Sequence, residues 1–329
     1  MTSSLIKQIS SLIVVLAVAL SAKANDYTQY VNPLMGSQSS FELSAGNTYP
    51  AIARPWGMNF WTPQTGKMGD GWAYTYDAHK LRGIKQTHQP SPWINDYGQF
   101  SIMATVGKPV FDENERESWF SHKGEECLPY YYKVYLADYD VVAEVSPTER
   151  AAMFCFTFPE SDQSNIVIDA FDKGSSITVD AKKRRVTGYT TRNSGGVPDN
   201  FKNYFVVEFD KDFESYIVVE DSVLKTGLSH VETDHAGAII SFKTRKGEKI
   251  YVRTASSFIS PEQALLNLNN ELSDKSFDKL VAEGKDAWNH ELGKISVEGA
   301  TDRQMRTFYS WLYRSLLVPR KFYEIDKDG

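Results

Sequence analysis

From Phe100 to about Ala255 the sequence is a series of short apolar runs separated by turn-forming residues. The runs are rich in Val, Ile, Phe and Tyr, which favour strands, and turn signals such as Lys246-Gly247 separate several of them. No helical pattern alternates with the runs, so the series predicts an antiparallel β-sandwich and not a parallel α/β sheet. Strands are expected at residues 100–106, 130–136, 141–145, 151–158, 166–171, 185–190, 204–209, 215–219, 238–242 and 249–254.

A helical pattern replaces the strands from Ser260 onward. Apolar residues recur at helical spacing as far as Leu292, with Ser260 in an N-cap position and Pro261 at the first helical position. A short strand-like piece follows at residues 294–298, and a further helix is expected from Thr301 to Leu317. The mainly β chain therefore divides into a sandwich (25–260), a helical linker (261–298) and a final helical segment (299–329).

The last expected helix carries more apolar surface than the end of a chain normally exposes. Met305, Phe308, Leu312 and Leu316 are spaced for one face, with further apolar residues beside them. Such a stripe needs a partner. Either the helix docks back on the sandwich, or a helical domain follows it, and we favour the second interpretation.

Before the strands, residues 47–98 are dense in Gly and Pro and hold four of the seven tryptophans. Neither helical nor strand periodicity continues through this stretch for more than a few residues, so it predicts shaped loops. Loops on a rigid scaffold are common binding surfaces, and large aromatic side chains among polar neighbours suit a ligand with apolar faces and hydroxyl groups, such as a sugar. The alternative is that the tryptophans pack in the core.

The N-terminus has the pattern of a secretory signal, with Lys7, an apolar run from Leu12 to Leu20 and small residues before an expected cleavage site after Ala24. The run is shorter than the ~20 residues that span a bilayer. Because no later segment is apolar enough to insert in a membrane, we expect an exported protein, periplasmic or secreted.

The net charge limits the classes of binding partner, and the two cysteines limit the possible disulfides to one. Loss of Lys7 and Lys23 with the leader takes the formal net charge from −6 to −8, and without a basic stripe this argues against nucleic acid and anionic membranes as partners. Export permits a bridge between Cys127 and Cys155, but spacing does not fix the pairing. Cys155 lies in a strand-like run and is expected to be a small buried apolar residue.

Several short motifs follow one another along almost the whole mature chain. They are Val31-Asn32-Pro33-Leu34-Met35-Gly36, Gly46-Asn47-Thr48-Tyr49-Pro50, Arg54-Pro55-Trp56-Gly57-Met58, Gly83-Ile84-Lys85-Gln86-Thr87-His88, Asn95-Asp96-Tyr97-Gly98, Ala287-Trp288-Asn289-His290-Glu291-Leu292 and Thr307-Phe308-Tyr309-Ser310-Trp311-Leu312-Tyr313-Arg314. In this order and spacing they resemble glycoside hydrolase family 92, the calcium-dependent exo-acting α-mannosidases. Each motif alone is weak, whereas their order and spacing make the match specific.

The resemblance implies the front portion of a longer enzyme, in which residues 299–329 begin an (α/α)6 barrel that continues beyond Gly329. It also implies inverting hydrolysis of terminal α-mannosides, with mannose-containing glycans as the binding partners. That reaction uses a carboxylic acid and a carboxylate ~6.5–9.5 Å apart. In the family these groups and the calcium ligands lie in the barrel, so no catalytic or metal-binding residue is assigned to this chain, and the segment alone is expected to be inactive.

The resemblance also implies that sandwich loops contribute to the mannose pocket. On that basis Trp61 and Trp72 are the first candidates for a wall against the sugar, and Trp93 is the next candidate. The alternative for each of the three indoles is packing in the core or within the loops. The sequence makes no prediction of linkage specificity or oligomeric state.

Three polar residues are further candidates for binding the sugar. His88 would donate a hydrogen bond to a hydroxyl group, unless it is a buried histidine that bonds to backbone. Asp96 would bind a hydroxyl, unless it caps its own turn. Asp328, with Asp326 as the weaker choice, matches a barrel-entry motif that reaches the substrate in the family.

Other interpretations have less support from the residues. The closing Asp326-x-Asp328-Gly329 resembles the start of a calcium loop but lacks the later ligands. Asp70 and Asp77 flank Trp72 and would be acidic candidates in a self-contained glycosidase, although their spacing singles out neither. The chain as a whole would alternatively be a non-catalytic carbohydrate-binding sandwich or a remnant without function.

Overall fold

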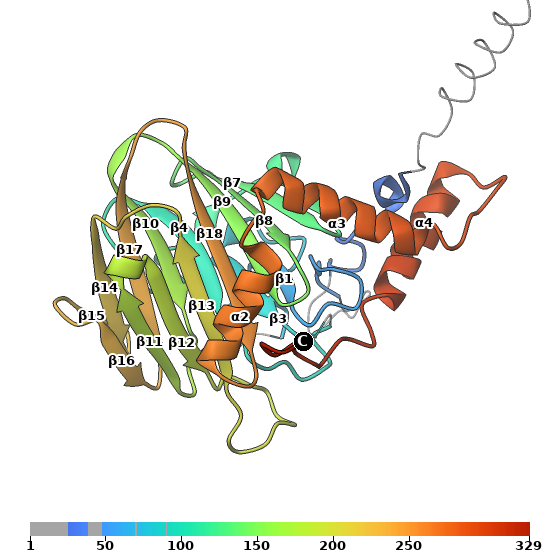
Figure 1. Cartoon of the computed structure of the whole chain (residues 1–329). Coiled ribbons are helices and arrows are strands. Elements are labelled where there is room, and N and C mark those ends of the chain that lie inside the picture. The colour runs from blue at the N-terminus through green and yellow to red at the C-terminus, as the bar shows by residue number, and fades with distance from the viewer. Residues whose placement is uncertain (1–25, 39–47, 70, 90) are drawn as a thin grey trace, which may run out of the picture.

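The computed structural model describes residues 26–38, 48–69, 71–89 and 91–329, and within these ranges a seven-stranded and a nine-stranded antiparallel sheet pack face to face (Figure 1). The expected leader peptide, Asn47 and Asp70 lie outside the described residues. Among the residues described, no helix has the length and apolar character needed to cross a membrane.

The strands of each sheet come from distant places in the sequence. The smaller sheet has the order β1 (Phe60–Gln64), β3 (Gly83–Thr87), β4 (Ser101–Val106), β10 (Ser161–Asp169), β17 (Ala236–Thr244), β14 (Ser215–Glu220) and β15 (Val223–Lys225). The larger has the order β16 (His230–Thr233), β11 (Ser175–Asp180), β12 (Arg185–Thr190), β13 (Asn203–Phe209), β18 (Glu248–Ser257), β9 (Ala151–Phe158), β8 (Val141–Pro147), β7 (Tyr131–Leu136) and β6 (Glu126–Leu128). A separate ribbon pairs β2 (Lys80–Leu81) with β5 (Ser118–Trp119). The predicted mainly β antiparallel sandwich is confirmed.

Strand β9 shows why several strands are apolar along their whole length. Its residues Phe154 and Phe156 point into the core between the sheets, whereas Met153 and Cys155 face the opposite way, toward the helices. Because successive side chains of a strand alternate between faces, a strand covered on both sides is apolar throughout. Cys155 is fully buried as expected, and it is not bridged to Cys127.

The region expected to consist of loops contains the strands β1, β2 and β3, so that aspect of the prediction is wrong. Strands β1 and β3 belong to the seven-stranded sheet. The two strands pair in register, with Trp61 opposite Gln86 and Pro63 opposite Ile84. Strand β1 is the outer edge of its sheet, and an edge strand tolerates Pro63 because only one side of it must donate hydrogen bonds. By contrast, the strand-like piece at residues 294–298 forms no strand.

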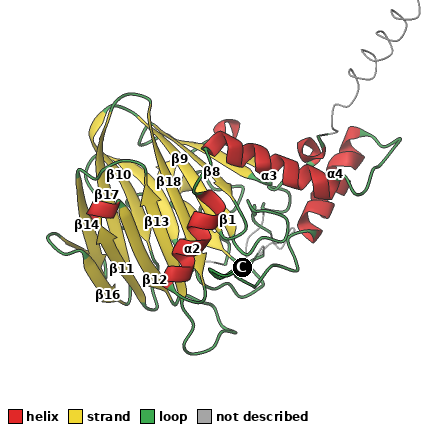
Figure 2. Ribbon diagram, viewed as in Figure 1, coloured by secondary structure: helices red, strands yellow, loops and turns green. Residues whose placement is uncertain are grey.

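Three α-helices follow the last strand: α2 (Pro261–Leu272), α3 (Phe277–Leu292) and α4 (Asp302–Ser315). Helix α2 lies across the outer face of the nine-stranded sheet, where Ala264, Leu268 and Leu272 are buried against it (Figure 2). The predicted N-cap is present, because the Ser260 hydroxyl accepts a hydrogen bond of 3.1 Å from the amide of Gln263.

Helix α4 packs against α3 and the short 3₁₀ helix η1 (Tyr27–Tyr30) at the N-terminal end of the described chain (Figure 1). Its fully buried side chains are Tyr309 and Tyr313, with Leu317 just after the helix. The expected stripe of Met305, Phe308, Leu312 and Leu316 is only half-buried at the margin of this cluster. The tyrosines form the inner face because their hydroxyls reach the backbone oxygens of Ile295 and Ala51.

Candidate functional site

Two of the predicted sugar-wall residues, Trp72 and Trp93, meet at the surface of the sandwich. They come from different loops, Trp72 from the one after β1 and Trp93 from the one after β3, and their rings contact edge to face with centroids 5.4 Å apart. Trp72 is half-buried, whereas Trp93 is 56% exposed and its neighbour Ile94 is 48% exposed. An exposed indole supported by a second one offers an apolar face next to polar loop backbone, which suits a sugar ring.

Trp61 lies elsewhere, and its predicted role in the sugar wall is wrong. It is fully buried between the sheets, where its ring contacts Phe100 at 5.6 Å on one side and Phe154 of β9 at 5.1 Å on the other. The reason is its position on β1, whose five residues are all buried. A ligand in a surface pocket would not touch this indole.

The proposal of a sugar-binding His88 is also wrong, because its side chain is fully buried below the loops. Nδ1 lies 2.5 Å from the backbone oxygen of Tyr97, and Nε2 lies 3.0 Å from Oδ1 of Asn59. The imidazole stacks on the Tyr97 ring at a centroid distance of 5.0 Å. Burial lowers the pKa of His88 to about 4 despite the nearby charge of Asp96, so the ring is neutral at neutral pH.

Asp96 holds its loop together, because four protein groups donate hydrogen bonds to its carboxylate. Oδ1 accepts hydrogen bonds of 2.9 Å from the amides of both His88 and Tyr97. Oδ2 accepts from the Thr87 hydroxyl at 2.6 Å and from the Gln99 side-chain amide. These bonds use the acceptor capacity of an ionised carboxylate. These contacts match the alternative that Asp96 caps its own turn, while a sugar-binding role stays a prediction because Asp96 also lines a cavity.

A small polar cavity of about 120 Å³ lies among these loops. Its lining includes the polar residues Tyr49, Lys85, Asp96, Gln99 and Arg192, together with the loop around Pro92 and Ile94. At roughly 30 Å³ per water molecule the cavity has room for about four waters, or for one polar substituent of a sugar ring. It adjoins the loop that carries Trp93 and so extends the exposed aromatic surface with hydrogen-bonding groups.

The last predicted site residue, Asp328, lies in an exposed turn at the end of the chain. Its side chain is 75% exposed and pairs with Lys327 at 2.9 Å, while its amide donates to Oδ1 of Asp326. Asp77, the second acidic candidate beside Trp72, is also exposed and accepts a hydrogen bond from Gln38. The structure brings neither carboxylate to the tryptophan pair, and a role for Asp328 stays a prediction.

A larger hollow of about 690 Å³ lies where the sandwich meets α2, α3 and the end of the chain. It is lined by charged groups of both signs, which include Arg54, Arg150, Glu149 and Glu271. Arg54 belongs to one of the family-like motifs and is held by the backbone oxygens of Pro147 and Leu280, at 3.0 and 3.2 Å, and burial lowers its pKa.

The carboxylates around this hollow are engaged in ion pairs. Glu271 contacts Arg150 at 3.0 Å and Glu283 contacts Lys275 at 2.6 Å. The hydrogen bond from Lys275 lowers the pKa of Glu283, although partial desolvation opposes it. A general acid for glycoside hydrolysis needs a carboxyl group whose pKa is raised, so Glu283 is not suited to that role.

Calcium, which the family resemblance implies, normally takes six to eight oxygen ligands, with carboxylates among them. Within residues 26–38, 48–69, 71–89 and 91–329, no three or more His, Cys, Asp or Glu side chains are grouped as metal ligands. No residue of these ranges is assigned to the ion.

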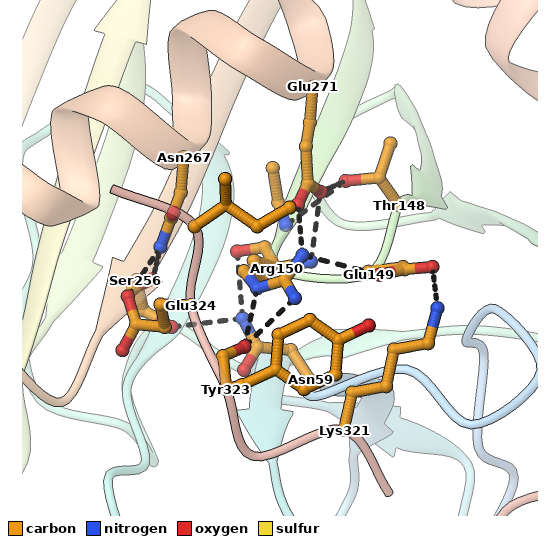
Figure 3. A network of polar contacts seen from close by, with 12 residues as sticks. Asn59, Thr148, Glu149, Arg150, Ser256, Asn267, Glu271, Lys321, Tyr323 and Glu324 are labelled. Atoms are coloured by element: carbon orange, nitrogen blue, oxygen red, sulfur yellow. Dashed lines mark hydrogen bonds and ion pairs between the residues drawn. The ribbon is translucent and has the colours of Figure 1, made fainter. Parts of the chain in front are cut away.

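The sequence does not reveal four residues at the junction between the sandwich and the end of the chain. They are Arg150, Tyr97, Arg320 and Glu324. They connect the end of the chain to the sandwich, as Figure 3 shows for Arg150 and Glu324. A weak signal was present, since Tyr97 lies in the Asn95-Asp96-Tyr97-Gly98 motif. Arginines in strand turns and tails carry no local pattern that predicts a long-range contact.

Comparison with known proteins agrees with the motif resemblance. Residues 30–257 match the glycosyl hydrolase family 92 N-terminal domain and residues 263–329 match the family 92 catalytic domain. The structure superposes on an inverting family 92 mannosidase of Bacteroides thetaiotaomicron with a TM-score of 0.91 and 49% identity, over 94% of this chain and 42% of that one.

Two further proteins are similar to this chain. A second family 92 α-mannosidase of Bacteroides thetaiotaomicron, also solved with mannoimidazole, is 30% identical over 92% of this chain, with a TM-score of 0.83 in the first structure. An uncharacterized secreted glycosidase of Arthroderma benhamiae is 24% identical over 90% of this chain. The chain spans 42% of the length of the inverting mannosidase and 42% of the length of the fungal protein. This chain belongs to glycosyl hydrolase family 92.

Proposed function

We propose that this chain is the N-terminal portion of an exported α-mannosidase that hydrolyses terminal α-mannosides of glycans with inversion at the anomeric carbon. The observation that carries the proposal is the 49% identity to an inverting mannosidase across 94% of the chain. In this proposal residues 25–260 form the sandwich domain, 261–298 the helical linker and 299–329 the start of an (α/α)6 catalytic barrel.

The contribution of this segment is a binding surface. Trp93, backed by Trp72, would lie against the apolar face of a sugar, and the polar cavity beside the loop would receive a hydroxyl-bearing substituent. The acid and the base of the inverting reaction, ~6.5–9.5 Å apart, would come from chain beyond Gly329. Residues 25–329 alone are then expected to bind a mannoside weakly and to release no mannose.

Calcium belongs to the same proposal through the family resemblance. We propose that its ligands are supplied by the region of the enzyme that follows Gly329, and we assign no step of the reaction to it. The residues of this chain would then act by binding and orienting the glycan, and the ion would contribute to sugar binding when it is present.

Mannose release by the longer enzyme tests the proposal. We expect the protein that continues past Gly329 to hydrolyse an aryl α-mannoside, and proton NMR to show β-mannose as the first product, because inversion changes the anomer. Early appearance of α-mannose would contradict inversion, and no release from any α-mannoside would contradict the function. N-terminal sequencing of the exported protein, expected to begin at Asn25, tests the leader peptide.

The second candidate is a carbohydrate-binding sandwich that does not cleave its ligand. The exposed tryptophan pair favours it, since such a surface binds sugar without any acid or base nearby. The two candidates differ in the behaviour of the longer protein, which would bind mannosides in both cases and release mannose only in the first.

A further inference from the structure

Residues 316–325, which we call the bridge segment, leave helix α4 and run back across the sandwich toward α2. Two backbone hydrogen bonds fix its first half beside the loop at Trp56, whose amide donates to Leu316 O at 2.9 Å and whose oxygen accepts from the Lys321 amide at 3.0 Å. Farther on, the side chain of Gln263 on α2 donates to Ile325 O at 2.8 Å. The segment therefore joins three regions of the fold that are distant in sequence.

Arg150 holds the middle of the bridge segment from the turn between β8 and β9 (Figure 3). Its Nε and Nη2 both donate to the backbone oxygen of Tyr323, at 3.1 and 2.9 Å, and its guanidinium lies 5.3 Å from the centroid of the Tyr323 ring. Nη1 contacts Glu271 of α2 at 3.0 Å, and the side chain is only 4% exposed. The planar fork of an arginine makes this geometry, and a lysine does not reproduce it.

Glu324 provides a second anchor one residue farther along. One carboxylate oxygen accepts from the amide of Phe258 at 2.9 Å. The other accepts from the side-chain amide of Asn267 at 2.7 Å, and Figure 3 shows Asn267 and Glu324 side by side. Asn267 also donates to the backbone oxygen of Ser256 at 2.9 Å, so the end of β18, helix α2 and the bridge segment are tied together. Both bonds to Glu324 have a charged acceptor and belong to the stronger class.

The same segment reaches the loop that carries Trp93. Nη2 of Arg320 donates to the hydroxyl of Tyr97 at 2.8 Å, and the guanidinium lies 5.8 Å from the Tyr97 ring and 5.0 Å from the ring of Phe322. Tyr97 is the residue whose ring stacks on the buried His88, and its amide is held by Asp96. A displacement of the bridge segment would therefore remove a support from this loop.

We propose that Arg150 is a positioning residue for the sugar site: by holding the bridge segment it keeps Arg320 on Tyr97 and so fixes the loop of Trp93 relative to the catalytic domain of the enzyme. The proposal rests on the proposed function, because the site is that of a mannosidase. Arg150 itself lies apart from the tryptophan pair and acts through the segment.

The test uses the longer, active enzyme with Arg150→Lys and, as a matched control, Arg185→Lys. Nε and Nη2 of Arg185 on β12 both donate hydrogen bonds to one oxygen of Glu208. Arg150 donates to one oxygen of Tyr323 in the same way, but Arg185 lies away from the bridge segment. We expect Arg150→Lys to raise KM for an aryl α-mannoside about five- to tenfold with kcat within about twofold, because uniform binding is lost. The control should change neither constant.

A fold defect gives a different result, because it lowers the active fraction and therefore kcat without changing KM. A fall in kcat at constant KM, or kinetics equal to those of the control, would overturn the positioning role. Glu324→Gln provides a second variant that keeps Arg150 in place and should give the same rise in KM. Its matched control is Glu214→Gln, which weakens only the exposed ion pair with Lys243.

Hydrogen exchange separates this proposal from the proposed function. The amides of Trp56, Phe258 and Lys321 report docking of the bridge segment, and peptides covering residues 93–98 report the loop. Faster exchange in both regions in Arg150→Lys, and not in Arg185→Lys, supports the coupling whatever the substrate is. Unchanged exchange overturns it, whereas a wild-type enzyme that releases no mannose overturns the proposed function alone.

Discussion

The indole of Trp61 is buried between the two sheets, and its packing there contributes to the free energy of unfolding. The indole touches Phe100 on one side and Phe154 on the other, and its removal would leave a cavity that neither sheet can close without moving. We expect Trp61→Ala to lower the free energy of unfolding by about 3–5 kcal/mol, measured by urea denaturation.

Trp119→Ala is the matched control for that measurement. Trp119 lies on β5 and is 52% exposed, so its loss should change the free energy of unfolding by less than about 1 kcal/mol. Equal effects of the two substitutions would show that Trp61 is not the core residue described above.

His88 gives the fold a pH dependence whose sign follows from its burial. Its folded-state pKa of about 4 lies below the ordinary value near 6.5, so between these values the unfolded chain binds the proton more tightly. The stabilising contribution is complete above about pH 6.5 and is lost as the pH falls toward 4, by roughly 3 kcal/mol in all.

Urea denaturation at several pH values checks this prediction. His88→Gln should flatten the slope of stability between pH 6.5 and 4, whatever it does to stability at pH 7. His230→Gln, at an exposed position on β16, is the matched control substitution. A wild-type slope retained in His88→Gln would mean that other groups cause the pH dependence.

At the scale of elements, helix α3 contains a glycine where helix propensity alone favours alanine by ~1 kcal/mol. Gly284 lies against the sheet, and a Cβ placed there would lie 2.7 Å from Cβ of Tyr130 and 3.3 Å from Nη1 of Arg54. Because backbone-proximal atoms cannot swing away, we expect Gly284→Ala to destabilise the protein by about 1–3 kcal/mol in spite of its propensity gain.

Thermal or urea unfolding measures this effect, with Gly124→Ala as the control. Gly124 has open space around the position of an added Cβ, and its substitution should remain within about 0.5 kcal/mol of the wild type. If Gly284→Ala were more stable than the wild type, α3 would not lie as close to Tyr130 as the structure places it.

The elements also show which features of the fold a sequence can predict. The ten strands expected between residues 100 and 254 and the N-cap Ser260 were identifiable because alternation, turn residues and capping act over a few neighbouring positions. The sequence did not predict the other strands of this region, which are β5, β6, β11, β15 and β16. The sequence does not predict β1 and β3, because Pro63 and the glycines of this region are typical of loops. The two strands form because they pair with each other.

The candidate site was less predictable for the same reason. Residue type alone groups Trp61, Trp72 and Trp93 as candidates for one sugar-binding wall. The side chain of Trp61 instead points into the core because of its position on the strand, whereas the loops bring Trp72 and Trp93 together at the surface. Likewise, polar type alone did not show that Asp96 is saturated by four donors or that His88 lies beneath the loop. The contact of Arg150 with Tyr323 spans 173 positions and leaves no local signal.

At the scale of the whole molecule, the sandwich and the helices share a buried cluster. Val31, Phe60, Trp288 and Tyr313 meet in it, and the indole of Trp288 donates to Ala53 O at 2.8 Å. Helices α3 and α4 are therefore fixed to the sandwich and not tethered loosely to it. This arrangement would present the start of a catalytic domain to the aromatic loops in a defined orientation.

The place of calcium can be tested at this scale. A ligand that binds only the folded state raises Tm. If the calcium ligands lie beyond Gly329, as proposed, millimolar calcium should leave Tm of the 329-residue chain within about 1 °C, and should raise both Tm and activity of the chelator-treated longer enzyme. A calcium-dependent Tm of the 329-residue chain would contradict this placement of the ligands.

The role of the tryptophan pair is tested most directly by steady-state kinetics of Trp93→Ala in the longer enzyme, with Trp119→Ala as an equally exposed control. Loss of an indole that contacts the sugar is expected to raise KM for an α-mannoside about tenfold, equivalent to ~1.4 kcal/mol of binding, while Tm stays near that of the wild type. KM should not change in Trp119→Ala. A Trp93→Ala enzyme with wild-type KM and kcat would contradict the assignment of this surface to the mannoside site.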